Sequence, residues 1–151
     1  MRRTLALFCV VSIFLSCTPS PPRTQLPDDI AACEAVFLPW WNTLKAEDRK
    51  AIRAVYFPDT GAVVFPNAFF DKYAGTSPPI MRNSELKSEA IDGKDWFWQF
   101  SELRRIETNT FEMDAGYYCG GLCARHCSYR VGRQTDGTWK IVRRGNSCVV
   151  S

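Results

Sequence analysis

The 151-residue sequence lacks a complete catalytic or cofactor-binding motif, and it contains a single histidine. It also lacks a large excess of charge of one sign. Its formal net charge is +3, and it falls to +1 if Arg2 and Arg3 leave with the N-terminal segment described below. Nucleic-acid-binding proteins usually carry a strongly basic surface, so this near balance argues against a nucleic-acid partner. We expect no cofactor.

The sequence has no apolar run long enough to cross a membrane. The run from Leu5 to Leu15 has about half of the ~20 residues that a transmembrane helix needs, and prolines follow soon after it. A short apolar run behind a basic start is typical of an export signal. We therefore expect residues 1–16 to be a signal peptide.

The signal ends in Phe14-Leu15-Ser16-Cys17, which resembles the lipobox of bacterial lipoproteins. In that family the cysteine becomes the acylated first residue of the mature protein. Phe14 and Leu15 stand where the family usually has leucine and a small residue, whereas Ser16 fits, so cleavage by an ordinary signal peptidase is the alternative. The resemblance implies a membrane anchor at Cys17 and a place in the bacterial cell envelope, with the outer membrane or cell surface favoured.

A proline-rich segment, residues 17–27, follows the signal. Such a chain stays extended at ~3 Å per residue, so it could hold a domain ~30 Å from the lipid headgroups. We expect it to be a tether. Residues 28–151 then have the length of one domain.

The first part of this domain shows helical spacing. Asp28 and Asp29 offer an N-cap, and apolar residues recur at intervals of three and four from Ile30 to Leu44. Pro39 predicts either a kink near Leu38 or a second helix that begins there. The apolar face continues through Val55, so helix is expected nearly to Pro58. Further expectations are a strand at Ala62–Phe65 and, among long loops, a short helix at Ser84–Ile91.

From Phe100 onward, apolar and polar residues alternate, which is typical of strands with one buried face. Asp136-Gly137 predicts a tight hairpin turn that leads to a return strand with Trp139 and Ile141 facing the core. The aromatic cluster 96–100 is a core element or a ligand-binding wall, and we favour the core. The predicted class is α+β, with N-terminal helices packed on an antiparallel β-meander of about four strands.

The C-terminal part resembles a group of small, functionally uncharacterised bacterial lipoproteins. The resemblance rests on Cys119-Gly120-Gly121-Leu122-Cys123, on Asp136-Gly137-Thr138-Trp139 and on the ending Val149-Val150-Ser151. It covers roughly the last fifty residues, and the chain departs from the group at Ala124 and Cys148. The likeness implies a helix-plus-sheet fold of the cystatin-like or NTF2-like kind, and it implies no activity.

Five cysteines remain in the domain, and cysteines outside the cytoplasm tend to be oxidised. Cys119 and Cys123 are the first expected disulfide pair, because the two glycines between them permit a sharp bend. A two-residue turn at Asp136-Gly137 would set Cys127 diagonal to Cys148. Their pairing would therefore need a bulge at Gly145 or a longer loop. Cys33 is either a competing partner or a buried free thiol.

Two functional hypotheses, a zinc site and a cysteine nucleophile, concern the segment from Cys119 to Cys127. Cys119, Cys123, His126 and Cys127 offer four ligands that zinc would accept, but neighbouring residues on a strand point to opposite faces, so we predict no metal site. A cysteine nucleophile, Cys123 or Cys127, with His126 as its base meets the same objection. No catalytic residue is predicted.

The C-terminal hairpin is rich in arginine, and it is either a solvated sheet face or a patch for an anionic lipid, glycan or acidic protein. We expect a non-catalytic binding or envelope-associated module. The alternative is a small periplasmic enzyme with a pocket between sheet and helices. The candidate binding residues are Arg125, Arg130, Arg133, Arg143 and Arg144.

Overall fold

The computed structural model describes residues 26–86, 93–121 and 123–150, and of Ser147 the backbone only. The predicted signal peptide, Cys17 and most of the tether lie outside the described residues, as does most of the short helix expected at Ser84–Ile91. None of the helices in the described ranges is long and apolar enough to span a membrane.

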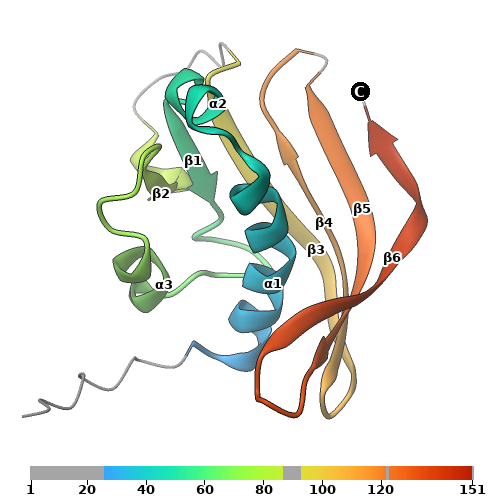
Figure 1. Ribbon diagram of the computed structural model, residues 1–151. Coiled ribbons are helices and arrows are strands. Elements are labelled where there is room, and N and C mark those ends of the chain that lie inside the picture. Colours follow the sequence, from blue (N-terminus) through green and yellow to red (C-terminus); the bar gives the residue numbers. More distant parts are fainter. Residues whose placement is uncertain (1–25, 87–92, 122, 151) are drawn as a thin grey trace, which may run out of the picture.

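The described chain forms one mixed sheet with helices on one side (Figure 1). In the sheet the strand order is β2-β1-β3-β4-β5-β6; β1 runs parallel to β2 and β3, and the other pairs are antiparallel. The helical elements are α1 (Asp28–Thr43), α2 (Ala46–Ala51), α3 (Asn67–Lys72) and the 3-10 turn η1 (Asn83–Glu85). The strands are β1 (Ala54–Phe57), β2 (Ile80–Arg82), β3 (Asp95–Glu107), β4 (Thr110–Tyr118), β5 (Ala124–Arg133) and β6 (Trp139–Val150).

The predicted architecture, N-terminal helices on an antiparallel meander of about four strands, is wrong. The described sheet has six strands, and two of them, β1 and β2, come from the half that we expected to be helical or irregular. These two strands join the sheet in parallel, beyond the four antiparallel strands β3 to β6. The domain is thus mostly β. The expected α+β class is wrong, and so is the cystatin-like or NTF2-like fold that was expected with it.

The end of the expected helix is strand β1. All four of its residues are buried, so it lacks the apolar–polar alternation of a half-exposed strand. A short apolar run of this kind cannot be told from a buried helix by periodicity. The strand expected at Ala62–Phe65 is also wrong. The chain is irregular there, although Val63 and Phe65 insert their side chains into the core.

Helix α1 begins at Asp28, as predicted, and continues through Pro39, so no second helix begins at that proline. Its apolar stripe is buried against the sheet, where α1 lies over β4, β5 and β6. Phe37 is the centre of this contact: its ring lies 5.0 Å from that of Phe57 and 5.4 Å from that of Trp98. The core is therefore an aromatic layer between α1 and the middle of the sheet.

The C-terminal hairpin forms at the predicted place but with a longer loop. The Gln134 amide donates to the Thr138 carbonyl at 2.7 Å, and the strands pair from Arg133 opposite Trp139. Two register shifts follow along β5 and β6, and the second lies beside Gly145. Together they bring Cys127 directly opposite Cys148. The expected bulge beside Gly145 is confirmed, whereas the longer loop by itself would set Cys127 opposite Gly145 and does not bring the two cysteines together.

Candidate functional site

The structure does not bring the five candidate arginines together on one surface. Arg130 and Arg143 are directly opposite each other on β5 and β6, on the face of the sheet that turns away from α1. Arg125 and Arg133 occupy the alternate positions of β5, which face the helix side, and Arg144 pairs with Tyr129 on that side as well. The basic hairpin is therefore two separate groups.

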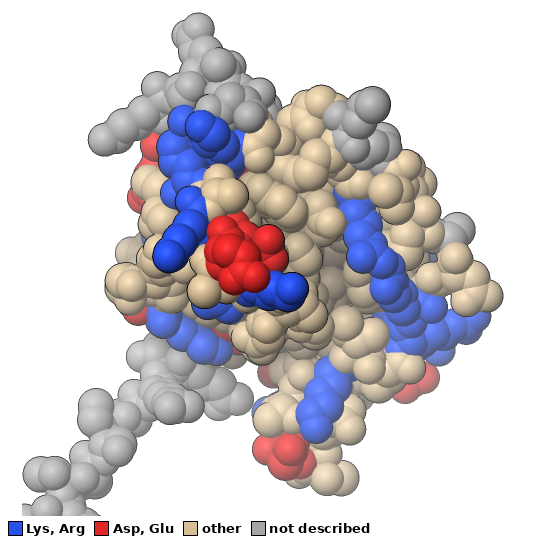
Figure 2. Space-filling view, turned by 45° about the horizontal axis from the view of Figure 1, so that its top comes forward, with Lys and Arg blue, Asp and Glu red and all other residues tan. Residues whose placement is uncertain are grey.

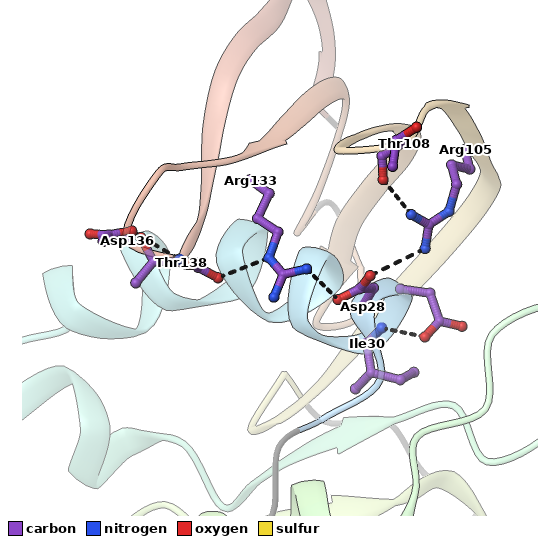
Figure 3. A network of polar contacts seen from close by, with 9 residues as sticks. Asp28, Ile30, Arg105, Thr108, Arg133, Asp136 and Thr138 are labelled. Carbon is purple, nitrogen blue, oxygen red and sulfur yellow. Dashed lines mark hydrogen bonds and ion pairs between the residues drawn. The ribbon is translucent and has the colours of Figure 1, made fainter.

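Arg133 is engaged at the N-terminus of α1. It lies 3.7 Å from a carboxylate oxygen of Asp28, and Arg105 lies 3.5 Å from the other one (Figure 3). Asp28 thereby joins the ends of the two hairpins, β3–β4 and β5–β6, to the start of the helix. With its charge paired and its side chain one-third exposed, Arg133 is a structural residue.

On the face away from α1, Glu112 lies between two arginines. It accepts hydrogen bonds from Arg104 at 2.7 Å and from Arg130. These hydrogen bonds, from Arg130 first, hold the pKa of the Glu112 carboxyl below its usual value. A shallow cavity of about 600 Å³ lies over this row and also reaches Arg143. Acidic and basic groups alternate here, so the charges of this face are largely compensated.

The helix-side face is open beyond the end of α1. In Figure 1 the upper halves of β5 and β6 diverge from the helix, and Figure 2 shows a row of Lys and Arg side chains on the side of the molecule where the C-terminal strands lie. Arg125 and Arg144 are exposed on this part of the sheet. Neither has a carboxylate partner among the described residues. These two side chains supply uncompensated positive charge.

An aromatic cluster borders this open face. Trp40 at the end of α1, Trp96 on β3 and Tyr117 on β4 are half-buried, with ring centroids 5.1 Å apart for the two tryptophans and 4.7 Å for Trp96 and Tyr117. Tyr117 is directly opposite Arg125 in the β4–β5 register. Side chains in that relation are neighbours, at roughly 5 Å between Cβ atoms. Arg144 on β6 contacts the sulfur of Cys127, two residues after Arg125 on the same face of β5. We call the surface formed by Trp40, Trp96, Tyr117, Arg125 and Arg144 the Trp–Arg face.

The four candidate cysteines lie in two pairs at disulfide distance. Cα atoms are 5.2 Å apart for Cys119 and Cys123 and 4.4 Å apart for Cys127 and Cys148. Both pairs stiffen the end of the sheet that carries the Trp–Arg face. Cys33 is a buried free thiol, and burial raises its pKa far above the ordinary range, so it is unreactive.

This pairing also bears on the zinc and nucleophile hypotheses. The sulfurs that zinc would need are bonded to each other, and His126 points to the face opposite Cys127 on the strand. Neither the zinc set nor a cysteine–histidine pair is therefore assembled at Cys119 to Cys127.

A groove of about 870 Å³ lies between α1, α3 and the turn that precedes Trp139. Glu34, only 6% exposed, is its buried polar group. Its carboxylate accepts hydrogen bonds from the Tyr73 hydroxyl and, at 2.7 Å, from the Lys72 ammonium. This groove is the counterpart of the pocket that the enzyme alternative required, and its buried acid is already hydrogen-bonded to Tyr73 and Lys72.

Trp40 and Tyr117 carried no functional signal in the sequence, because they belong to a helical apolar segment and to the alternating pattern of a strand. Trp96 belongs to the cluster 96–100, for which a ligand-binding wall was the alternative that we did not favour. Glu34 sits inside the apolar stripe of α1, where its burial could have been suspected from helical spacing.

In comparisons with known proteins, no family model matches the chain, and neither a curated protein nor a solved structure matches it significantly.

Proposed function

We propose that the protein is an exported lipoprotein of the bacterial cell envelope, anchored through Cys17, whose domain binds an acidic carbohydrate on the Trp–Arg face and catalyses no reaction. The observation that carries the binding proposal is the position of Arg125 directly opposite Tyr117 of the half-buried aromatic cluster, with Arg144 exposed on the next strand. Neither arginine has a carboxylate partner in the described ranges. The two disulfide-distance pairs, which are typical of exported proteins, support the compartment.

The ligand class follows from the two kinds of side chain. Sugar rings pack their C–H faces on tryptophan and tyrosine, whose rigid rings lose little entropy on binding. Guanidinium groups bind carboxylate or phosphate with two parallel hydrogen bonds. A polymer of acidic sugars offers both an apolar ring face and a carboxylate on each sugar unit. An anionic lipid or an acidic peptide would use the arginines but leave the aromatic rings without a matched partner.

The groove beside Glu34 supports a second candidate, a small periplasmic enzyme. A catalytic carboxylate there would have to exchange its bonds to Tyr73 and Lys72 for bonds to a substrate. On the Trp–Arg face no ion pair of the described residues has to be broken, because Arg125 and Arg144 are exposed and Arg144 donates to two cysteine sulfurs. For this reason the binding function is the main proposal.

The test is a titration of the mature protein with oligogalacturonate, followed by tryptophan fluorescence. We expect saturable binding that weakens as salt is raised, because charges that are exposed are screened. Methyl-esterified oligogalacturonate, which has the same sugar rings without the charge, should bind at least about tenfold more weakly, as should the Arg125→Gln/Arg144→Gln variant to the free acid. Arg143→Gln, on the opposite face, is the matched control and should bind normally.

Three results would contradict the proposal. Equal affinity of the double variant and the native protein would exclude the two arginines. Equal affinity for the acid and its ester would exclude charge recognition. Binding to phosphatidylglycerol vesicles without any binding to the oligogalacturonate would identify an anionic lipid surface as the partner instead.

A further inference from the structure

Arg144 lies directly on the Cys127–Cys148 pair. Its Nη2 is 2.9 Å from the sulfur of Cys148 and 3.3 Å from that of Cys127. A guanidinium within hydrogen-bond distance of a sulfur stabilises the thiolate relative to the thiol and to the disulfide. The contact therefore places Cys127 and Cys148 beside a positive charge that would favour their reduced, thiolate forms.

The two sulfurs differ in access. Cys127 is 2% exposed, whereas Cys148 is half-buried, four residues after Arg144 on β6. Strand β6 is an edge strand, and Val149 and Val150 beside Cys148 are 71% and 72% exposed. A thiolate from outside can therefore approach Cys148, and an edge strand opens locally at little free-energy cost near its end.

The other disulfide-distance pair provides an internal comparison. Cys119 is fully buried, and the polar contact of its sulfur runs to the Cys123 carbonyl rather than to a cation. Cys123 is half-buried like Cys148, so each pair has one accessible sulfur. Among the described residues, what distinguishes the pair Cys127 and Cys148 is the guanidinium at its sulfurs.

We propose that Cys127 and Cys148 form an exchangeable disulfide, which a dithiol reductant of the cell envelope opens and which re-forms when the same chemistry runs backward. The proposal does not rest on carbohydrate binding, since it concerns the oxidation state of two sulfurs.

The reaction is a two-step exchange. A thiolate of the dithiol attacks the sulfur of Cys148, the S–S bond breaks, and its electron pair leaves on Cys127 as a thiolate beside Arg144. The second thiolate of the reductant then attacks the reductant sulfur of the mixed disulfide, and Cys148 is released as a thiolate. The reductant becomes a disulfide and loses two electrons, which the protein gains. The two protons given up by the reductant go to solvent or to the protein thiols.

Arg144 assists both steps, because a better-stabilised thiolate is a better leaving group. Arg125, two residues from Cys127 on the same face of β5, adds a second positive charge at longer range, and Tyr129 is the other polar neighbour on that strand. The arginine is a positioning and charge-stabilising residue; the cysteines carry the chemistry.

The experiment equilibrates the full-length native protein with graded ratios of reduced to oxidised dithiothreitol, without denaturant, and counts the thiols of each cysteine peptide by alkylation and mass spectrometry. We expect the Cys127–Cys148 bond to open at lower dithiothreitol ratios than the Cys119–Cys123 bond. Arg144→Gln should require about a tenfold higher ratio and should raise the pH midpoint of Cys148 alkylation by about one unit. Arg144→Lys should fall between the two, and Arg143→Gln should match the native protein.

Circular dichroism of each sample distinguishes exchange in the folded protein from exposure by unfolding. The proposal is overturned if the Cys127–Cys148 bond opens only where the circular dichroism signal is lost. It is equally overturned if Arg144→Gln and Arg143→Gln titrate alike. If Arg144→Gln fails to fold, the comparison of Arg144→Lys with Arg143→Gln decides on the same criteria.

Discussion

Among single residues, Glu34 and Tyr73 form the most informative contact. The carboxylate is nearly inaccessible, and the Tyr73 hydroxyl, which donates to it, is on a residue that is 7% exposed. Burial, and then the hydrogen bond to Glu34, raise the pKa of Tyr73 far above its ordinary value of 10.0. The hydroxyl therefore stays protonated in the folded state at pH values where it ionises in the unfolded chain.

This contact predicts alkaline destabilisation. Above about pH 10 the unfolded chain loses a proton that the folded protein retains, so the free energy of unfolding falls by up to about 1.4 kcal/mol per pH unit from this residue. Below that pH its contribution is complete. Tyr73→Phe should cost about 1–3 kcal/mol at pH 7, because Glu34 loses a donor, but its stability should decline less steeply above about pH 10. Urea unfolding at pH 8, 10 and 11 measures both effects.

The matched control is Tyr118→Phe, which removes a hydroxyl from a half-buried tyrosine of β4. It reports how much the loss of a tyrosine hydroxyl outside the Glu34 contact changes the dependence of stability on pH. If the free energy of unfolding of Tyr73→Phe fell with pH as steeply as that of the native protein, the Tyr73 hydroxyl would be free to ionise in the folded state.

For single residues, the sequence predicted contacts between residues close in the chain better than contacts between residues far apart in it. The pair Cys119 and Cys123 followed from two intervening glycines, since a short loop leaves few geometries. The partner of Arg133 did not follow, because Asp28 lies more than one hundred positions earlier, and only the completed fold brings the two together. The Trp–Arg face was missed for the same reason: its residues come from α1 and four strands.

Among the elements, β4 and β5 depend on a close approach at Gly116. A Cβ atom added there would lie 1.8 Å from the Arg125 carbonyl oxygen and 2.6 Å from the Cα of His126. Both are backbone atoms of the neighbouring strand, so no side chain can move aside. Gly116→Ala must therefore push the two strands apart.

We expect Gly116→Ala to lower the free energy of unfolding by about 3 kcal/mol or more, which is the upper end for overpacking. Gly145→Ala is the control. Its added Cβ would be 3.3 Å from the Cβ of Ser128 at the bulge, so a cost of about 1 kcal/mol or less is expected. Chemical denaturation of both variants gives the comparison, and equal losses would contradict the close approach.

Element prediction succeeded where the signal is local. The start of α1 followed from acidic residues ahead of an apolar stripe, and the hairpin strands followed from alternation and Asp136-Gly137. It failed for β1 and β2. The first is buried on both faces and the second has three residues, so neither alternates over a useful length. Strand β1 pairs in parallel with both β2 and β3, and no turn motif predicts a parallel pairing between segments distant in sequence.

At the scale of the whole molecule, the domain is polarised along α1. Asp28 at one end ties the helix to both hairpin ends, whereas the other end, at Trp40, leaves the sheet uncovered beside the Trp–Arg face (Figures 1 and 3). The described residues begin with Leu26 and Pro27, directly before the Asp28 end of the helix. A tether that enters there leaves the Trp–Arg face at the opposite end of the helix, pointing away from the attachment point.

This polarity gives the proposed lipid anchor a testable role. If Cys17 is acylated, the native protein should fractionate with bacterial membranes, and its intact mass should exceed that of the chain from Cys17 to Ser151 by the mass of the lipid. Cys17→Ser should appear in the soluble fraction without that mass. Cys9→Ser is the matched control and should remain in membranes.

The anchor and the binding face should act independently. Because the binding face lies at the far end of the domain, Cys17→Ser should bind oligogalacturonate with unchanged affinity. Membrane association of Cys17→Ser, or an intact mass without lipid in the native protein, would contradict the anchor while leaving the binding face untouched.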